Sequence, residues 1–197
     1  MKNQVSFCAN LILEKYPDFH PQIGLVLGSG LGTFADSVEV ISKTSFKELP
    51  GFPKAGVGGH AGQLILGLIG RTKVAVLQGR AHYYEEGKAD AMSVAIKTLK
   101  EIGCQSLVIT NAAGTINEAA SPGEIMLITD HVNMTGVSPL FGCTERDRFV
   151  DMTNAYDTDL SNIMRQAATK NNIKLNEGVY AWCCGPQFET PAEINAL

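Results

Sequence analysis

The sequence predicts an α/β fold with a central mixed, mainly parallel β-sheet flanked by helices. Short apolar runs typical of buried strands alternate along the chain with longer segments in which apolar residues recur at helical spacing. The strand segments are apolar on both faces, which is typical of a sheet covered by helices on two sides. With 197 residues, of which 45% are apolar and 18% charged, the chain has an ordinary globular composition, and we expect a single domain over residues 1–197.

The first half of the chain predicts one helix, one strand and a hairpin. The segment Met1–Tyr16 is interrupted by polar residues and lacks a cleavage pattern, so it predicts a helix rather than a signal peptide. Ile23–Leu27 is a short apolar run that predicts a buried strand. Leu64–Ile69 and Lys73–Leu77 flank Gly70-Arg71, and this arrangement predicts a β-hairpin.

The second half predicts two amphipathic helices and three strands. A first helical stripe precedes Gly103, which stands where a helix C-terminus favours glycine. That stripe is Met92, Ala95, Ile96, Leu99 and Ile102. A second stripe is Leu160, Ile163, Met164, Ala167 and Ala168. The predicted strands are Leu107–Thr110, Ile125–Thr129 and Val179–Cys183.

The last residues of the sequence predict the start of a helix that has room for less than two turns. Thr190 is a typical N-cap, Pro191 suits the first helical position, and Glu193 completes a capping box. The chain stops at Leu197, less than two turns later, and so short a helix is marginal by itself. Both a short docked C-terminal helix and a truncated chain fit this pattern.

Charge and cysteine usage exclude several classes. The 16 basic and 20 acidic residues give a net charge of −4 without a basic run, which argues against nucleic acid or an anionic membrane as partner. No stretch approaches the roughly 18 apolar residues of a membrane span. The five cysteines are odd in number and lack Cys-x-x-Cys spacing, so we expect buried, reduced thiols in a cytoplasmic protein. The four histidines lack metal-ligand spacing, and we expect no metal site; they are His20, His60, His82 and His131.

Small and polar residues follow four of the predicted strands. In open α/β sheets, ligands bind beyond the carboxyl ends of the strands, so these segments predict a shared site. They are Gly28-Ser29-Gly30-Leu31-Gly32, the run from Gln78 to Tyr84, Asn111-Ala112-Ala113-Gly114, and Gly185-Pro186-Gln187-Phe188-Glu189.

Two of these segments suit a phosphate group. Backbone N–H groups of Gly28–Gly32 and the Ser29 hydroxyl can approach an anion, although a simple tight turn is an equal alternative. Thr33 stands where the dinucleotide fingerprint needs glycine. Arg80 offers a planar fork for phosphate oxygens, and His82 can donate beside it; a surface arginine and a capped histidine remain the alternative.

Other candidates are weaker taken singly. His60 lies in a glycine-rich segment where a ligand can come close, whereas His20 and His131 are assigned to structure. Phe188 and Glu189 pair an aromatic face with a carboxylate, which suits a planar heterocycle with N–H groups at its edge. Glu189 also suits the N-terminus of the following helix.

Together these segments resemble the trimeric type of purine nucleoside phosphorylase, and they occur in that family's order across nearly the whole chain. The matching stretches are Gly28–Gly32, Pro50–Pro53, Gly59–Gly62, Gly79–Glu85, Thr110–Gly114, Asp130–Asn133, Asn154–Asp157 and Gly185–Thr190. The related methylthioadenosine phosphorylases lack the Phe-Glu-Thr of the last stretch.

The resemblance implies reversible phosphorolysis of purine ribonucleosides to the free base and ribose 1-phosphate, in purine salvage. Its implied catalytic residues are His82 and Glu189. Its implied phosphate-binding residues are Ser29, His60, Arg80, Ala81, His82 and the backbone at Ala112. Its implied nucleoside-binding residues are Tyr84, Ala112, Ala113, Gly114, Phe188 and Glu189. It implies a cytoplasmic homotrimer that needs no metal or organic cofactor, because phosphate is itself the co-substrate.

Two departures from the family bear on activity. The family continues past Glu189 with further phosphate, ribose and base contacts, so the resemblance implies a domain incomplete at its C-terminus and slow or absent turnover by 197 residues. The segment between Pro139 and Asp151 is shorter than in the family, where it offers an aromatic residue to a neighbouring subunit. The alternatives are a truncated relic that binds phosphate or nucleoside or only oligomerises, and a methylthioadenosine phosphorylase.

Overall fold

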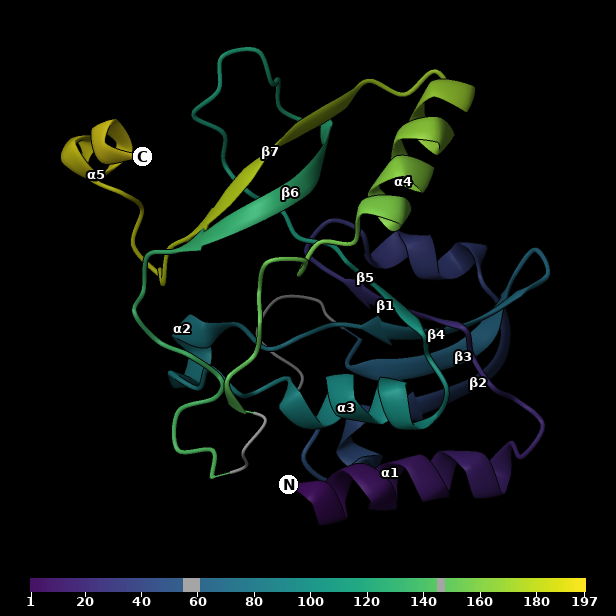
Figure 1. Cartoon of the computed structure of the whole chain (residues 1–197). Coiled ribbons are helices and arrows are strands. Elements are labelled where there is room, and N and C mark those ends of the chain that lie inside the picture. Colours follow the sequence, from purple (N-terminus) through teal and green to yellow (C-terminus); the bar gives the residue numbers. More distant parts are fainter. Residues whose placement is uncertain (55–60, 145–147) are drawn as a thin grey trace. The chain divides into compact units, whose positions relative to one another are not determined.

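The computed structural model describes residues 1–54, 61–144 and 148–197, which form two compact units (Figure 1). The first unit comprises Met1–Ala113 and the second comprises Gly114–Leu197. Each unit combines strands with helices, as the predicted α/β class requires.

The first unit is built on a five-stranded mixed sheet in the order β2-β3-β4-β1-β5. Strands β4, β1 and β5 run parallel to one another, whereas β2, β3 and β4 form antiparallel pairs. The strands are β1 Ile23–Leu27, β2 Glu39–Ser45, β3 Gln63–Ile69, β4 Thr72–Gln78 and β5 Ser106–Ile109. The predicted mixed sheet and the hairpin of β3 and β4 are confirmed, while β2 is a strand that the sequence did not predict.

Helices cover one face of this sheet, and Figure 1 shows α1 and α3 side by side there. The helices of the unit are α1 Lys2–Lys15, α2 Tyr83–Glu86 and α3 Ser93–Glu101, with 3-10 turns η1 Gly32–Ser37 and η2 Phe46–Glu48. Three members of the predicted stripe are buried, since Ala95, Leu99 and Ile102 are at most 1% exposed, whereas Met92 and Ile96 are half-buried against the same core. Gly103 follows with a positive φ of 119°, which explains the glycine at this helix end.

Successive side chains of β3 and β4 point to opposite faces of the sheet, and buried residues lie on both faces. Leu64 and Leu77 pack under α1 and α3, whereas Ile65 and Val76 face a smaller cluster on the other side. Ala35 of η1 belongs to that smaller cluster, so η1 covers part of the second face. The turn before η1, which carries Ser29, is therefore attached to a packed element.

In its described residues, 114–144 and 148–197, the second unit has two parallel strands and two α-helices. They are β6 Ile125–Asn133, α4 Thr158–Lys170, β7 Leu175–Trp182 and α5 Pro191–Ala196. The Asp157 side chain caps α4 by accepting the N–H of Leu160 at 2.8 Å. The predicted capping box of α5 is confirmed, since Glu193 and Thr190 each accept the other's backbone N–H. Strand β6 runs four residues beyond the predicted Thr129.

A polar cluster joins the starts of β6 and β7. Lys174 Nζ lies 2.7 Å and 2.8 Å from the two carboxylate oxygens of Glu124, and Asn176 Nδ2 donates to the same carboxylate at 2.9 Å. The hydrogen bonds from Lys174, Asn176 and the backbone of Ser121 lower the pKa of Glu124 to about 2. The carboxylate is thus held in its charged form by three donors.

This cluster predicts a pH-dependent effect of Glu124→Gln. A folded-state pKa below the ordinary 4.5 stabilises the fold above pH 4.5, and that contribution disappears as the pH falls toward 2. We therefore expect the variant to unfold at a lower urea concentration than the wild type near neutral pH. The difference between the two urea midpoints should become smaller as the pH is lowered. The matched control is Glu118→Gln, an exposed glutamate of the same unit. A difference in urea midpoint that does not change with pH would contradict an ionic origin of the stabilisation by Glu124.

Among the residues described, no helix is long and apolar enough to cross a membrane. Within the same ranges, no group of three His, Cys, Asp or Glu side chains is placed to hold a metal ion.

Candidate functional site

Three of the four predicted strand-end segments lie at one edge of the five-stranded sheet. Because β4, β1 and β5 are parallel neighbours, their carboxyl ends meet there. The segments that follow are Gly28–Leu31 after β1, Gly79–His82 after β4 and Thr110–Ala113 after β5. The structure therefore brings Ser29, Arg80, Ala81, His82, Ala112 and Ala113 to the same edge of the first unit.

Thr110 joins the end of β5 to the end of β1. Its hydroxyl donates to the Val26 carbonyl and accepts the N–H of Gly28, each at 3.0 Å. The two strand ends approach so closely that a Cβ on Gly28 would lie 2.4 Å from the Thr110 carbonyl oxygen. Only glycine fits at this position, which explains the first glycine of the Gly28–Gly32 run.

The run continues as a tight turn that presents Ser29. The N–H of Leu31 donates to the Gly28 carbonyl at 3.2 Å, and Gly30 has a positive φ of 82°. Ser29 lies exposed between them. The structure thus shows a tight turn that leaves the Ser29 hydroxyl accessible, and both sequence interpretations of this segment are compatible with it.

His82 is positioned by Glu85, a residue to which sequence reasoning assigned no role. One carboxylate oxygen of Glu85 accepts the backbone N–H of His82 at 2.8 Å, and the other lies 3.6 Å from His82 Nδ1. The imidazole also stacks on the Tyr84 ring, with centroids 5.1 Å apart and planes 17° from parallel. The sequence signal was the spacing of three residues between His82 and Glu85 at the start of α2.

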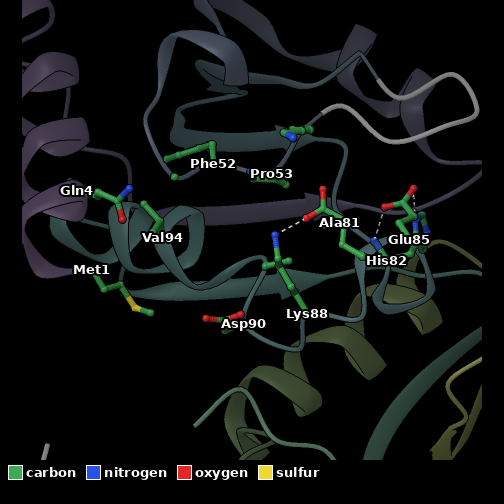
Figure 2. A pocket seen from close by; sticks show the side chains of 14 residues that line it. Met1, Gln4, Phe52, Pro53, Ala81, His82, Glu85, Lys88, Asp90 and Val94 are labelled. Atoms are coloured by element: carbon green, nitrogen blue, oxygen red, sulfur yellow. Dashed lines mark hydrogen bonds and ion pairs between the residues drawn. The ribbon is translucent and has the colours of Figure 1, made fainter. Parts of the chain in front are cut away.

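A cavity of about 290 Å³ lies beside this histidine. Figure 2 shows Ala81, His82, Glu85 and Lys88 on one side, and Met1 and Gln4 at the start of α1 on another. The cavity is lined by charges of both signs: Lys88 Nζ lies 2.7 Å from a carboxylate oxygen of Glu86, and both residues line it. The cavity gives His82 and Ala81 a concave surface within the first unit.

In the second unit, Phe188 and Glu189 lie between β7 and α5. Phe188 is 94% exposed, so its ring is available to a planar ligand. Glu189 is half-buried and contacts Cys183: the pKa of that thiol is raised by burial and then by the hydrogen bond to Glu189. Sequence reasoning treated all five cysteines as buried thiols, whereas only Cys8 is buried and the other four are half-buried.

The remaining predicted residues fall into three groups. Tyr84 is 53% exposed on α2, and Gly114 begins the second unit. His60 lies outside the described residues, so its predicted phosphate contact is untested. His131, assigned to structure, accepts or donates a hydrogen bond with the Tyr156 hydroxyl at 3.1 Å, which agrees with that assignment.

Comparison with known proteins places the chain in a family. The sequence profile of the phosphorylase superfamily matches residues 22–197. The chain is 42% identical over 200 residues to purine nucleoside phosphorylase 1 of Bacillus subtilis (strain 168), an alignment that covers 100% of this chain and 73% of the relative. It is 36% identical over 197 residues to purine nucleoside phosphorylase of Mus musculus, covering 94% of this chain and 67% of the relative.

A solved structure agrees with the sequence relatives. The crystal structure of isoform 2 of purine nucleoside phosphorylase from Schistosoma mansoni, in complex with cytosine and ribose-1-phosphate, matches with a TM-score of 0.89 at 35% identity. The match covers 98% of this chain and 70% of that chain. With a profile match over most of its length and relatives at this identity, the chain belongs to the phosphorylase superfamily and, within it, to the purine nucleoside phosphorylases.

Proposed function

We propose that the chain catalyses reversible phosphorolysis of purine ribonucleosides, giving the free purine base and ribose 1-phosphate. The observation that carries this proposal is the meeting of three strand-end segments, with Ser29, Arg80 and His82 among their residues, at one sheet edge. The similarity to purine nucleoside phosphorylases supports it along the whole chain.

The first unit supplies the proposed phosphate contacts. Arg80 provides a planar, charged fork, and the Ser29 hydroxyl and His82 imidazole provide further donors. The backbone at Ala81 and Ala112, together with the His60 side chain, completes the proposed set. Glu85 holds the backbone of His82, and the Tyr84 ring stacks on the imidazole, so both the backbone and the ring of His82 have a defined partner.

The proposed nucleoside contacts are assigned residue by residue, on the similarity to the purine nucleoside phosphorylases. Tyr84 contacts the ribose, with Ala112, Ala113 and Gly114 lining the nucleoside. Phe188 stacks on the purine with its 94% exposed ring, and Glu189 accepts the N–H groups at the edge of the base. A carboxylate acceptor favours 6-oxopurines, whose N1 carries a proton.

The chemistry follows from the charges that develop during bond cleavage. The sugar becomes oxocarbenium-like, and a phosphate anion held beneath it stabilises the growing positive charge. The leaving base gains negative charge, which a proton at N7 neutralises. The hydrogen bond from the N–H edge of the base to Glu189 orients the base. Phosphate is the nucleophile, so we propose that the reaction uses no metal or organic cofactor.

We further propose that the protein acts as a homotrimer in the cytoplasm. The similarity to the trimeric type of the family supports this assembly, and the mild net charge of −4 fits small-molecule substrates better than a polyanionic partner.

The proposal is tested by incubating the purified chain with inosine and phosphate and measuring hypoxanthine and ribose 1-phosphate. We expect base release that requires phosphate, and reversal when base and ribose 1-phosphate are supplied instead. High enzyme concentration and long incubation allow slow turnover to be measured, and calorimetry with phosphate measures binding separately.

Each contrary outcome has its own meaning. Base release without phosphate contradicts phosphorolysis and indicates a hydrolase. Faster turnover of methylthioadenosine than of inosine indicates the methylthioadenosine branch. Phosphate binding without any turnover, even at high enzyme concentration, indicates a binding-only relic.

A further inference from the structure

We propose that Gln78 is a positioning residue for phosphate, because its side chain fixes the glycine turn after β1 relative to the segment after β4. This inference rests on the proposed function and goes beyond it by assigning a role to a residue that does not touch the substrate. Gln78 is the first residue of one of the predicted strand-end segments, but nothing in the sequence assigns this glutamine a role of its own.

Gln78 occupies a junction in the sheet. It is the last residue of β4, where it pairs with Gln63 in the antiparallel ladder to β3 and with Leu27 in the parallel ladder to β1. The next four residues are Gly79, Arg80, Ala81 and His82, and the residue after Leu27 is Gly28. The proposed phosphate contacts therefore begin immediately beyond this point on two neighbouring strands.

The side-chain amide of Gln78 bridges two partners. Its Nε2 donates to the carbonyl of Gly32 at 3.0 Å, and its Oε1 accepts from Gln63 Nε2 at 2.5 Å. A carbonyl only accepts, so the bond to Gly32 defines which way the amide points, and the amide then presents its oxygen to Gln63. Both functional groups of the side chain are thus engaged in one orientation.

These bonds close the glycine turn at its far end. Thr110 holds the first residue of the run, Gly28, and Gln78 holds the last, Gly32. Ser29 lies between the two fixed points. The Gln78 carbonyl also accepts the N–H of Gly62 at 3.0 Å, so the backbone entering β3 is attached to the same residue. One residue thereby sets the spacing between the Ser29 turn and the Arg80–His82 segment.

The test is Gln78→Met, which keeps the side-chain length and adds no charge but removes both hydrogen bonds. We expect the dissociation constant for inorganic phosphate, measured by calorimetry, to rise about tenfold. The KM for phosphate should rise equally, whereas the KM for inosine should stay within about twofold, because only the phosphate contacts are displaced. The melting temperature is measured alongside.

Two further variants keep the test decisive. Gln22→Met makes the same change at an exposed glutamine beside the opposite end of β1 and should leave phosphate binding unchanged. Gln63→Met removes one of the two bonds and retains the bond to Gly32, so a smaller rise is expected even if Gln78→Met does not fold.

The outcomes separate this inference from the proposed function. A lower melting temperature with unchanged phosphate affinity shows a merely structural glutamine and overturns the inference alone. Equal increases in both KM values overturn it as well. A wild-type chain that neither binds phosphate nor releases base overturns the proposed function, and this inference with it.

Discussion

Replacing Gly28 with alanine is expected to destabilise the first unit and to weaken phosphate binding together. The new methyl group would lie 2.4 Å from the Thr110 carbonyl oxygen and 2.9 Å from the Asn111 Cα, and both are backbone atoms that cannot rotate away. The ends of β1 and β5 must then separate, which costs about 2–3 kcal/mol. We expect thermal unfolding about 5–10 °C below the wild type.

The expected loss of phosphate affinity has the same origin. Separation of the strand ends breaks the 3.0 Å bond from Gly28 to the Thr110 hydroxyl and moves the Ser29 turn, so affinity should fall roughly tenfold. Gly32→Ala is the matched control, because a Cβ there meets nothing within 4 Å. If both alanine variants behave alike in thermal unfolding and calorimetry, crowding at Gly28 is not the cause.

The second large effect is expected from Arg80→Met. A guanidinium that makes two charge-assisted hydrogen bonds to phosphate contributes about 3 kcal/mol, so its removal should weaken phosphate binding about a hundredfold. The melting temperature should change far less than in Gly28→Ala, since Arg80 is half-buried at the end of β4 and outside the packed clusters.

Arg71→Met provides the charge-matched control for this experiment. Arg71 is exposed in the turn between β3 and β4, at the opposite end of β4 from Arg80. The two variants lose the same charge, so general electrostatic attraction of phosphate affects both. If calorimetry shows equal losses of phosphate affinity in Arg80→Met and Arg71→Met, the loss is caused by the change in net charge. That result would contradict a direct contact between Arg80 and phosphate.

Regular local patterns explain why much of the fold could be predicted. Ile23–Leu27 is a strand with the predicted bounds, and the Gly70-Arg71 turn connects β3 to β4 as expected. Thr190, Pro191 and Glu193 lie within four residues of one another, so their capping interactions need no distant partner. The fold was least predictable at β2, whose residues are largely exposed and lack an apolar run.

The positioning of the site depends on contacts that local patterns do not contain. Thr110 and Gly28 are 82 positions apart, and Gln78 and Gly32 are 46 apart, so their hydrogen bonds arise only when the strands are ordered in the sheet. The residue types at the strand ends predict a ligand site, and the structure brings three of those segments to one edge of the sheet. The side chains that hold those ends together have no signature of their own in the sequence.

Strand β4 has a further consequence for motion within the first unit. It is bonded to β3 on one side and to β1 on the other, and Val74, Ala75, Val76 and Leu77 are at most 2% exposed. Amides in such a central strand exchange with solvent only when the whole unit opens. We therefore expect the Arg80–His82 segment to begin at the part of the unit that opens least often, so that the end of β4 holds its first residues in place.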